Sequence, residues 1–385
     1  MSAALSNDWV SLQISDIADF GSGDSISVAR LTERSAVCPV PVFGGNGIAG
    51  YTSSATVSEP TVILGRVGQK CGVVYQNSGL AWITDNALYA RRFRRPVDVQ
   101  FFALALEFTR LNDVRNHNDL PLITQSILRD VKIAWPESMV EQRHIAEAVS
   151  DADEMITALQ RMIAKKQAIK RGVMQQRFAL SCDSVFQAQL GTVATFLSGG
   201  TPDRSNTEYW SGSIPWISAT TLKHVEVSTS DQSVTERAVR AGSRMAPLNS
   251  TLVLVRGSAL HSAIRASLVA APVCFNQDVK ALVPSARLEP KFLTYSIHAN
   301  ASRLLRLVTS AGNTAGVLDT KVLKAFDIWA PDRDTQRQVI SVFDDITSEL
   351  EVLTARLDKA KAIKQGMMQQ LLTGRTRLPV QEVAA

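Results

Sequence analysis

Apolar residues recur at alternating spacings of four and three in two separate segments of the chain. The first stripe consists of Ile145, Val149, Ala152, Ile156, Leu159 and Ile163. The second consists of Val339, Phe343, Ile346, Leu350, Leu353 and Leu357. This a/d spacing is typical of helices that pack side by side. The stripes falter at Lys166 and its surroundings and resume at Ile169, Val173, Ile363 and Met367.

Each stripe predicts a long helix. Pro136 and Pro331 stand just upstream, where proline suits the start of a helix. A helix of about 35 residues would be about 50 Å long at 1.5 Å per residue. Each segment carries a single stripe and has no other obvious mate, so we expect the two helices to pack on each other as an antiparallel coiled coil. The alternative is an ordinary core helix in each half.

The chain repeats itself. Residues 142–178 align without a gap on residues 336–372, at an offset of 194. Shorter matches join residues 128–136 to 323–331, and residues 14–23 to 190–199. A duplicated chain is expected to form two similar units with a pseudo-two-fold relation, as symmetric oligomers do.

The stretches between the repeats differ from each other and alternate between strand and helix signals. Short Val/Ile/Thr segments broken by glycine and polar residues predict strands at 61–66, 72–75, 251–256 and 279–283. Helical stretches are expected at 99–111 and 290–308, the latter with an apolar face of Phe292, Tyr295, Leu304 and Leu307. The predicted fold class is α+β: two variable domains (1–138 and 183–332), two spacer helices (139–182 and 333–378) and a flexible tail (379–385).

Composition narrows the class of protein. Four cysteines without a C-x-x-C pair suit reduced thiols, and no apolar stretch or leader is long enough for a membrane, so a cytoplasmic protein is expected. The net charge is only +5, with −1 on residues 1–138 and +3 on 183–332. A protein of this charge binds DNA only with a few well-placed basic side chains, or with charge from partners.

Two arginines stand directly after predicted strands. Arg66 and Arg256 close similar segments, and a glycine-containing turn follows each of them. Arginine pairs bidentately with guanine or phosphate, so these positions suit a DNA contact. A surface arginine in a salt bridge is the alternative.

Several apparent motifs do not carry chemistry. Gly45 to Gly50 fits G-x-G-x-x-G, but no helix start follows to hold a pyrophosphate, so a tight loop is expected. Asp278 and Glu289 have a loose nuclease-like spacing without a counterpart in the first half. No metal cluster or nucleophile–base pair is evident among the five histidines, His117, His144, His224, His261 and His298. The sequence therefore predicts no catalytic centre.

The motifs resemble those of a known family. Residues 197–202, 208–218, 255–258 and 276–281 are similar to the second target recognition domain of type I restriction-modification specificity subunits. The phrases from Pro136 to Arg143 and from Pro331 to Arg337, each opening a long helix, are similar as well. In residues 1–138 the resemblance is confined to the ends and to 46–51.

The resemblance implies a non-catalytic recognition subunit. Each target recognition domain would read one half of a split site in double-stranded DNA, and the helices would set the gap. The partners would be two methyltransferase subunits and, for cleavage, two motor-nuclease (restriction) subunits. This chain would hold no cofactor or metal, and the partners would use S-adenosylmethionine, ATP and Mg²⁺.

Loop position selects the residues expected to contact DNA. They are Asn46, Tyr51, Arg66, Gln69, Lys70, Thr201, Arg204, Ser218, Lys223, Arg256 and Ser258. Thr201 and Ser218 suit a turn or cap role equally well, and Trp216 is expected in the core. A stand-alone DNA-binding adaptor or clamp without methyltransferase partners is the alternative function. An enzyme built on Asp278 and Glu289, or on Gly45 to Gly50, ranks last.

Overall fold

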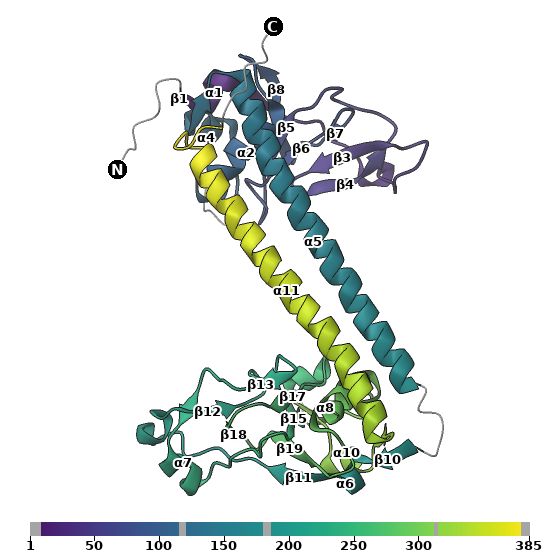
Figure 1. Ribbon diagram of the computed structural model, residues 1–385. Helices are drawn as coiled ribbons and strands as arrows, with labels where there is room; N and C mark the ends of the chain where they lie inside the picture. The colour runs from purple at the N-terminus through teal and green to yellow at the C-terminus, as the bar shows by residue number, and fades with distance from the viewer. Residues whose placement is uncertain (1–8, 115–120, 180–185, 312–314, 379–385) are drawn as a thin grey trace. The chain divides into compact units, whose positions relative to one another are not determined.

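The computed structural model describes residues 9–114, 121–179, 186–311 and 315–378 (Figure 1). The chain divides into two compact units. The first is Met1–Gln160 with Ala355–Ala385, and the second is Arg161–Thr354. Each unit therefore combines a globular part with one half of each long helix. The tail expected at 379–385, together with His117 and Cys182, lies outside the described residues.

The first unit is built on an antiparallel sheet of order β2–β8–β5–β6, with a second sheet β4–β3–β7 and a two-stranded sheet β1–β9. Its strands are β1 (Trp9–Gln13), β2 (Ala18–Ser22), β3 (Val40–Gly44), β4 (Gly47–Thr52), β5 (Val62–Gly65), β6 (Val74–Gln76), β7 (Trp82–Ile83), β8 (Ala87–Phe93) and β9 (Lys132–Pro136). Its short helices are α1 (Ile14–Ile17), η1 (Val28–Arg30), α2 (Val99–Phe108), α3 (Leu111–Val114) and α4 (Gln125–Asp130).

Helix α2 supplies the centre of the first core. The Asp98 side chain caps its start by accepting a hydrogen bond from the Phe101 backbone N–H at 2.9 Å. The buried rings of Phe101 and Phe102 meet Trp135 edge-on, at 5.4 and 5.9 Å between centroids. The helix expected over 99–111 ends at Phe108 because Arg110 has a φ of 50°, in the left-handed region.

The second unit has a five-stranded sheet of order β11–β19–β15–β17–β13, two three-stranded sheets (β14–β12–β18 and β16–β21–β20) and the pair β10–β22. Its strands are β10 (Gln187–Gln189), β11 (Ala194–Ser198), β12 (Ile214–Ile217), β13 (Glu226–Val227), β14 (Ser233–Val234), β15 (Thr251–Leu254), β16 (Arg256–Gly257), β17 (Ala266–Val269), β18 (Cys274–Phe275), β19 (Val279–Pro284), β20 (Thr309–Ala311), β21 (Ala315–Val317) and β22 (Asp327–Trp329). Its short helices are α6 (Leu190–Val193), η4 (Thr207–Trp210), α7 (Glu236–Ala241), η5 (Ser258–His261), α8 (Pro290–Ala299), α9 (Ala301–Leu305) and α10 (Thr320–Lys324).

The helical stretch expected at 290–308 is divided into α8 and α9 at Asn300, whose side-chain amide donates to the Ser296 carbonyl at 2.9 Å. Phe292, Tyr295 and Leu304 are buried as expected. Leu307 is 38% exposed, so its place on the apolar face was wrong. The physical reason is that the chain has left the helix at Arg306, and the 3.6-residue period no longer applies.

The two units repeat the same strand frame. Gly23 and Gly199, matched in the sequence, occupy equivalent places: a Cβ on either would lie 2.0 and 2.3 Å from the carbonyl oxygens of Ile83 and Phe275. The residue after each glycine donates to the same carbonyl at 2.9 Å, from Asp24 and Gly200 respectively. Only glycine permits this close approach of two backbones, which explains why both glycines are structural.

The register of the central strands corrects one sequence match. Arg66 donates its backbone N–H to Asn86 and accepts from Ile123, at 3.1 and 2.9 Å. In the second unit Val255 makes the equivalent bonds, to Asp278 and from Leu318, both at 2.8 Å. Val255, and not Arg256, is therefore the counterpart of Arg66. A shift of one residue sends a strand side chain to the opposite face.

A buried glutamine fastens each long helix to its globular part. Gln142 donates to the Pro136 carbonyl at 3.0 Å and accepts from the Asp98 backbone at 2.9 Å. Gln336 donates to the Pro331 carbonyl at 2.7 Å and accepts from the Glu289 backbone at 2.8 Å. Both glutamines are 0% exposed. The repeat therefore preserves a buried hydrogen-bond clamp as well as a hydrophobic stripe.

The long helices are α5 (Met139–Ala179) and α11 (Arg333–Leu371), which run side by side in opposite directions (Figure 1). In the first unit Asp153 pairs with Lys364 at 2.7 Å, and in the second Phe178 stacks on Phe343 at 6.2 Å between centroids. All members of both a/d stripes over 145–163 and 339–357 are buried or half-buried. The prediction of antiparallel, mutually packed helices is confirmed.

The stripes resume at two of the four predicted positions, since Val173 and Met367 are half-buried and pack against the two hydrophobic cores. Ile169 and Ile363 are 44% and 50% exposed, so they lie outside the seam. In place of these two isoleucines, Lys170 and Lys364 continue the four–three spacing of the stripes. The two lysines occupy equivalent positions of the repeat. Lys170 donates to the Thr347 hydroxyl at 2.7 Å, and Thr347 is the counterpart of Asp153, the partner of Lys364. The seam has polar positions because each ammonium finds an oxygen on the facing helix.

No helix in the described part of the chain is long and apolar enough to span a membrane.

Candidate nucleic-acid interface

Four loops meet at one end of the central sheet in each unit. β2 and β5 both pair with β8, so their carboxyl ends flank its first residues: Ser22 faces Leu88 and Gly65 faces Ala87. β11 and β15 flank β19 in the same way, where Ser198 faces Lys280 and Leu254 faces Val279. We call these loops the loop edge. It comprises residues 22–24, 44–47, 66–70 and 84–86 in the first unit, and 198–201, 218–220, 256–258 and 276–278 in the second.

The loop edge of the first unit brings together four of its five predicted contacts. Asn46 sits exposed in the hairpin between β3 and β4, and Gln69 and Lys70 are exposed in the turn after Arg66. The two loops touch, because a Cβ on Gly65 would lie 2.4 Å from the Gly45 carbonyl oxygen. A hollow of about 350 Å³ opens beside them. It is lined by Ile26, Val28, Leu31, Gly44, Gly45, Asn46, Gly47, Ile48, Ala49, Val67, Thr84, Asp85 and Asn86.

Tyr51 is separate from this group. It lies near the far end of β4, paired with Pro41 and bridged to Thr32, whereas Asn46 directly precedes the first residue of that strand. The sequence motif 46–51 suggested one site because it is continuous in the chain. A strand that rises about 3.3 Å per residue carries its two ends apart.

The side chain of Arg66 is half-buried. Its Nη1 donates to the Ser22 hydroxyl at 2.9 Å, and its Nε is buried and has no hydrogen-bond partner among the described residues. The equivalent Ser198 accepts from Lys280 Nζ at 2.6 Å. In both units a basic side chain therefore donates a hydrogen bond to the serine that ends the edge strand of the central sheet, β2 or β11. This geometry favours a positioning role for Arg66, whose contact with DNA stays a prediction.

In the second unit Thr201, Ser218, Arg256 and Ser258 gather at the loop edge. Arg256 and Ser258 are both exposed, one in β16 and the other at the start of η5. Ser218 forms the turn suggested as its alternative role: its carbonyl accepts from Thr221, and its hydroxyl meets that of Thr220 at 2.9 Å. Lys223 is exposed farther along, in the segment that leads to β13.

Arg204 is held over two tryptophan rings. Its guanidinium carbon lies 4.9 Å from the Trp210 ring centroid and 5.2 Å from that of Trp216. Trp216 is 2% exposed and is a core residue, as expected, while Arg204 itself is exposed. The contact limits the freedom of a flexible cation, and the DNA contact of Arg204 stays a prediction.

The loop that carries Arg204 is braced by its neighbour. The Asp203 carbonyl accepts from the Trp210 indole at 3.1 Å, and its carboxylate accepts from the Ser205 backbone and hydroxyl at 2.9 and 2.8 Å. These hydrogen bonds lower the pKa of Asp203 below its ordinary value. The carboxylate of Asp203 therefore stays ionised, and keeps these hydrogen bonds, to a lower pH than a free aspartate would.

Sequence reasoning missed two exposed residues of the loop edge. Asp85 and Gln277 are the middle residues of equivalent turns, 84–86 before β8 and 276–278 before β19. The turns correspond because Thr84 and Asn276 donate to Phe43 and Ile217 at 2.9 and 3.0 Å. An alignment of the two halves by strand register, rather than by similar letters, would have found them.

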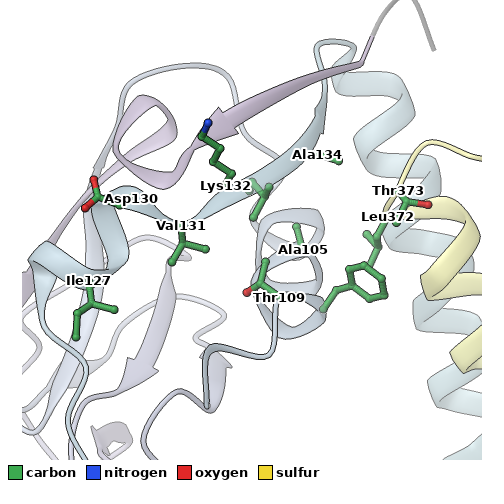
Figure 2. A pocket seen from close by; sticks show the side chains of 11 residues that line it. Ala105, Thr109, Ile127, Asp130, Val131, Lys132, Ala134, Leu372 and Thr373 are labelled. Carbon is green, nitrogen blue, oxygen red and sulfur yellow. The ribbon is translucent and has the colours of Figure 1, made fainter. Parts of the chain in front are cut away.

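A second hollow lies elsewhere in the first unit, where α2, α4, β9 and the end of α11 meet. Figure 2 shows its lining, of which Ala105, Thr109, Ile127, Leu372 and Thr373 are labelled, and its volume is about 640 Å³. In the second unit Phe178, the repeat counterpart of Leu372, packs on Phe292 and Trp329 at 5.5 and 5.7 Å. Smaller residues at the repeated positions leave this hollow, which suffices to explain it without a ligand.

The enzyme alternatives are not supported by the geometry. Asp278 and Glu289 stand beyond opposite ends of β19, a strand of 6 residues that spans about 20 Å. Glu289 is also committed to Arg333 and Arg337 at 2.8 and 3.0 Å. No helix starts in Gly45 to Gly50: Gly45 and Asn46 form the expected tight loop, but Gly47 to Gly50 belong to strand β4 and not to the loop.

Two α+β units, each with an equivalent loop edge but with different residues on it, define a scaffold that presents two related recognition surfaces. A family model described as the type I restriction modification DNA specificity domain matches the chain twice, over residues 6–171 and 186–362. The chain belongs to this family.

Curated relatives are similar over part of their length. The specificity subunit of the type I restriction enzyme EcoR124I/EcoR124II of Escherichia coli is 30% identical over 178 residues, which are 46% of this chain and 44% of that protein. The specificity subunit of MjaIX from Methanocaldococcus jannaschii is 28% identical over 177 residues, 44% of this chain and 39% of that protein. The matched region thus covers less than half of each relative.

Solved structures share the fold over nearly the whole chain. The S subunit of the type I restriction-modification system from M. genitalium has a TM-score of 0.63 at 17% identity, covering 96% of this chain and 98% of that one. A chain from a study of complex assembly and conformational transition in the type I system has a TM-score of 0.60 at 15% identity, covering 97% and 100%. These likenesses establish the architecture.

Proposed function

We propose that the chain is the DNA-recognition subunit of a type I restriction-modification complex. Each unit reads one half of a split DNA site with its loop edge, and the helix pair sets the spacer between the halves. The observation that carries this proposal is the repeated frame with unrepeated content: the same hydrogen bonds hold the loops in both units, while the exposed residues on the loops differ.

The loop edge has the composition of a DNA-reading surface. Asn46, Gln69 and Gln277 offer amides that suit adenine, and Arg256 offers a guanidinium group that suits guanine or phosphate. Arg204, three residues beyond the loop edge, offers a second guanidinium group. The small net charge of +5 is consistent with partners that supply much of the phosphate contact.

The chemistry would belong to the partners. Two methyltransferase subunits bound to the helix pair would use S-adenosylmethionine, and two restriction subunits would use ATP and Mg²⁺. The chain itself would act without a catalytic centre, a metal or a cofactor, in the cytoplasm where the DNA is. The family match favours this assembly over a stand-alone adaptor.

The test is a methylation map. The host genome is sequenced with detection of modified bases, before and after deletion of the gene for this chain. The proposal expects a motif of two short halves with a fixed gap, methylated only while the chain is present. Co-purification of a methyltransferase with the chain separates the complex from the adaptor. A genome without a split motif that depends on the chain refutes the proposal.

A further inference from the structure

The turns before β8 and β19 place one exposed polar residue each at equivalent points of the two loop edges. Asn86 and Asp278, the last residues of these turns, accept backbone hydrogen bonds from Arg66 and Val255 at 3.1 and 2.8 Å. Each turn is therefore tied at its last residue to the end of the central strand, β5 or β15, and at its first residue to the smaller sheet, through Phe43 of β3 or Ile217 of β12. Asp85 and Gln277 between them are held by rigid backbone and turned to solvent, as a reading residue requires.

The side chain of Gln277 is oriented. The Thr201 hydroxyl donates to its Oε1 at 2.5 Å, which occupies one lone pair of that oxygen and neither hydrogen of the Nε2 amide. An amide fixed in this way keeps one acceptor and two donor sites for a ligand. Adenine presents the matching pair in the major groove, an N6 donor and an N7 acceptor.

Asp85 offers the opposite character. Within the described residues its carboxylate has no hydrogen-bond donor or ion-pair partner, and it lines the hollow next to Asn46. A bare carboxylate is repelled by phosphates, so at a DNA-facing edge it needs a donor on a base. Adenine N6 and cytosine N4 are the major-groove donors, and cytosine suits a carboxylate better because adenine places the acceptor N7 beside its donor.

We infer that this turn position determines specificity in both units, with Gln277 reading an adenine in one half-site and Asp85 reading a cytosine in the other. Thr201 is a positioning residue that acts through Gln277. This inference rests on the proposed function and adds to it which residues read bases and which bases they select.

The experiment uses the full chain in its methyltransferase complex, with variants expressed in the deletion strain and their methylation motifs mapped. Gln277→Glu keeps the size of the side chain and removes its donors, so the required adenine should change to cytosine at a single position of one half-site. Asp85→Asn should admit adenine at a single position of the other half-site. Each variant should leave the opposite half-site and the spacer unchanged, so each serves as the control for the other.

Methylation of the original site should fall by roughly 5- to 150-fold for each variant, the range expected for one lost base contact. Thr201→Val should weaken selection at the position that Gln277→Glu changes and at no other. Thermal melting of the Gln277→Glu and Asp85→Asn variants should match that of the unmodified chain, because the side chains of Gln277 and Asp85 are exposed.

Three outcomes would overturn the inference. A native motif without adenine in one half and cytosine in the other contradicts it before any variant is made. Motifs left unchanged in both variants, or methylation lost evenly at all sequences, contradict it as well. If the native complex has no split motif at all, the proposed function itself has failed, which distinguishes the two failures.

Discussion

At the scale of single residues, two arginines that follow similar strands have different environments. Arg66 and Arg256 look alike in the sequence, yet the sheet register offsets them by one position. Arg66 turns toward Ser22 and is half-buried, whereas Arg256 is exposed on β16. The two arginines should therefore respond differently to the same substitution.

We expect Arg256→Ala to impair recognition without loss of stability. A lost base contact costs about 1–3 kcal/mol at one position of the motif, whereas a lost phosphate contact weakens binding to all sequences alike. Binding of the assembled complex to a randomised duplex library separates these two cases. Unchanged affinity together with an unchanged motif would remove Arg256 from the interface.

Arg66→Ala is the contrasting variant. Loss of the bond to Ser22 in a half-buried site should lower the free energy of unfolding by about 1–3 kcal/mol. The motif should keep its bases, because the loop and not the guanidinium would face the DNA. Urea unfolding gives the stability, and a methylation map gives the motif. A changed base preference in a fully stable variant would restore Arg66 as a reading residue.

The site could be predicted as far as loop position allows. Asn46, Gln69, Lys70, Thr201 and Arg256 follow strands that their own alternation reveals, and the structure gathers them at the loop edge. Tyr51 was misplaced because the sequence did not indicate that residues 47–52 form a strand that runs away from the loop edge. Asp85 and Gln277 were missed because their exposure depends on long-range strand pairing, which no local pattern encodes.

At the scale of elements, the helix starts are the most faithfully repeated structures. Gln142 and Gln336 are buried side chains whose amides bond only to backbone groups of the adjoining domain. In the sequence they are identical residues at equivalent positions of the repeat. The structure explains the choice of glutamine, because each buried site needs a side chain that donates one hydrogen bond and accepts another.

We expect Gln142→Ala and Gln336→Ala each to lower the free energy of unfolding by about 1–3 kcal/mol, because buried backbone groups lose their partners. Arg143→Ala is the matched control, since Arg143 is the exposed neighbour and its loss should change stability by less than about 0.5 kcal/mol. Denaturant titration of the three variants is the measurement. Equal stability of the glutamine and control variants would contradict the clamp.

We expect Lys170 to make the helix pair less stable than an apolar residue at the same position would. Burial lowers the pKa of Lys170 below its ordinary value of 10.5, against the opposing influence of Glu351 and Asp344. The unfolded chain therefore holds this proton more tightly than the native one. The native state gains stability as pH rises from the lowered pKa toward 10.5.

Lys170→Met should accordingly stabilise the protein by on the order of 1 kcal/mol near pH 7. The Thr347 hydroxyl keeps a partner in the variant, because it also donates to the Phe343 carbonyl at 2.6 Å. The advantage should shrink as pH approaches 10.5, since the native lysine then loses its charge. Melting curves from pH 7 to 10.5 test this, with the exposed Lys165→Met as the control. If the stability difference between Lys170→Met and the unmodified chain were no larger at pH 7 than at pH 10.5, a destabilising charge on Lys170 would be contradicted.

At the scale of the whole molecule, the periodicity of the sequence predicted two paired helices because the a/d pattern is long and occurs twice. It also predicted two α+β domains from their strand and turn signals. It did not predict the sheet orders, which depend on pairings between distant segments. The division of the chain at 138, 182 and 332 stays a prediction, since each compact unit takes half of each long helix.

We expect the helix pair to set the distance between the two recognition units. Helix α5 has 41 residues, about 60 Å at 1.5 Å per residue, and half-sites one helical turn apart lie roughly 34–36 Å apart. Lengthening both helices equally should move the readers along the duplex without changing what they read.

The most direct measurement is therefore a methylation map of a chain with seven residues inserted after Lys165 in α5 and seven opposite them after Glu351 in α11, both continuing the four–three spacing. Seven residues add about 10 Å, or up to about three base pairs. The account predicts a motif with the same bases in each half and a longer spacer. The original spacer in an active lengthened complex, or new bases in either half, would contradict it.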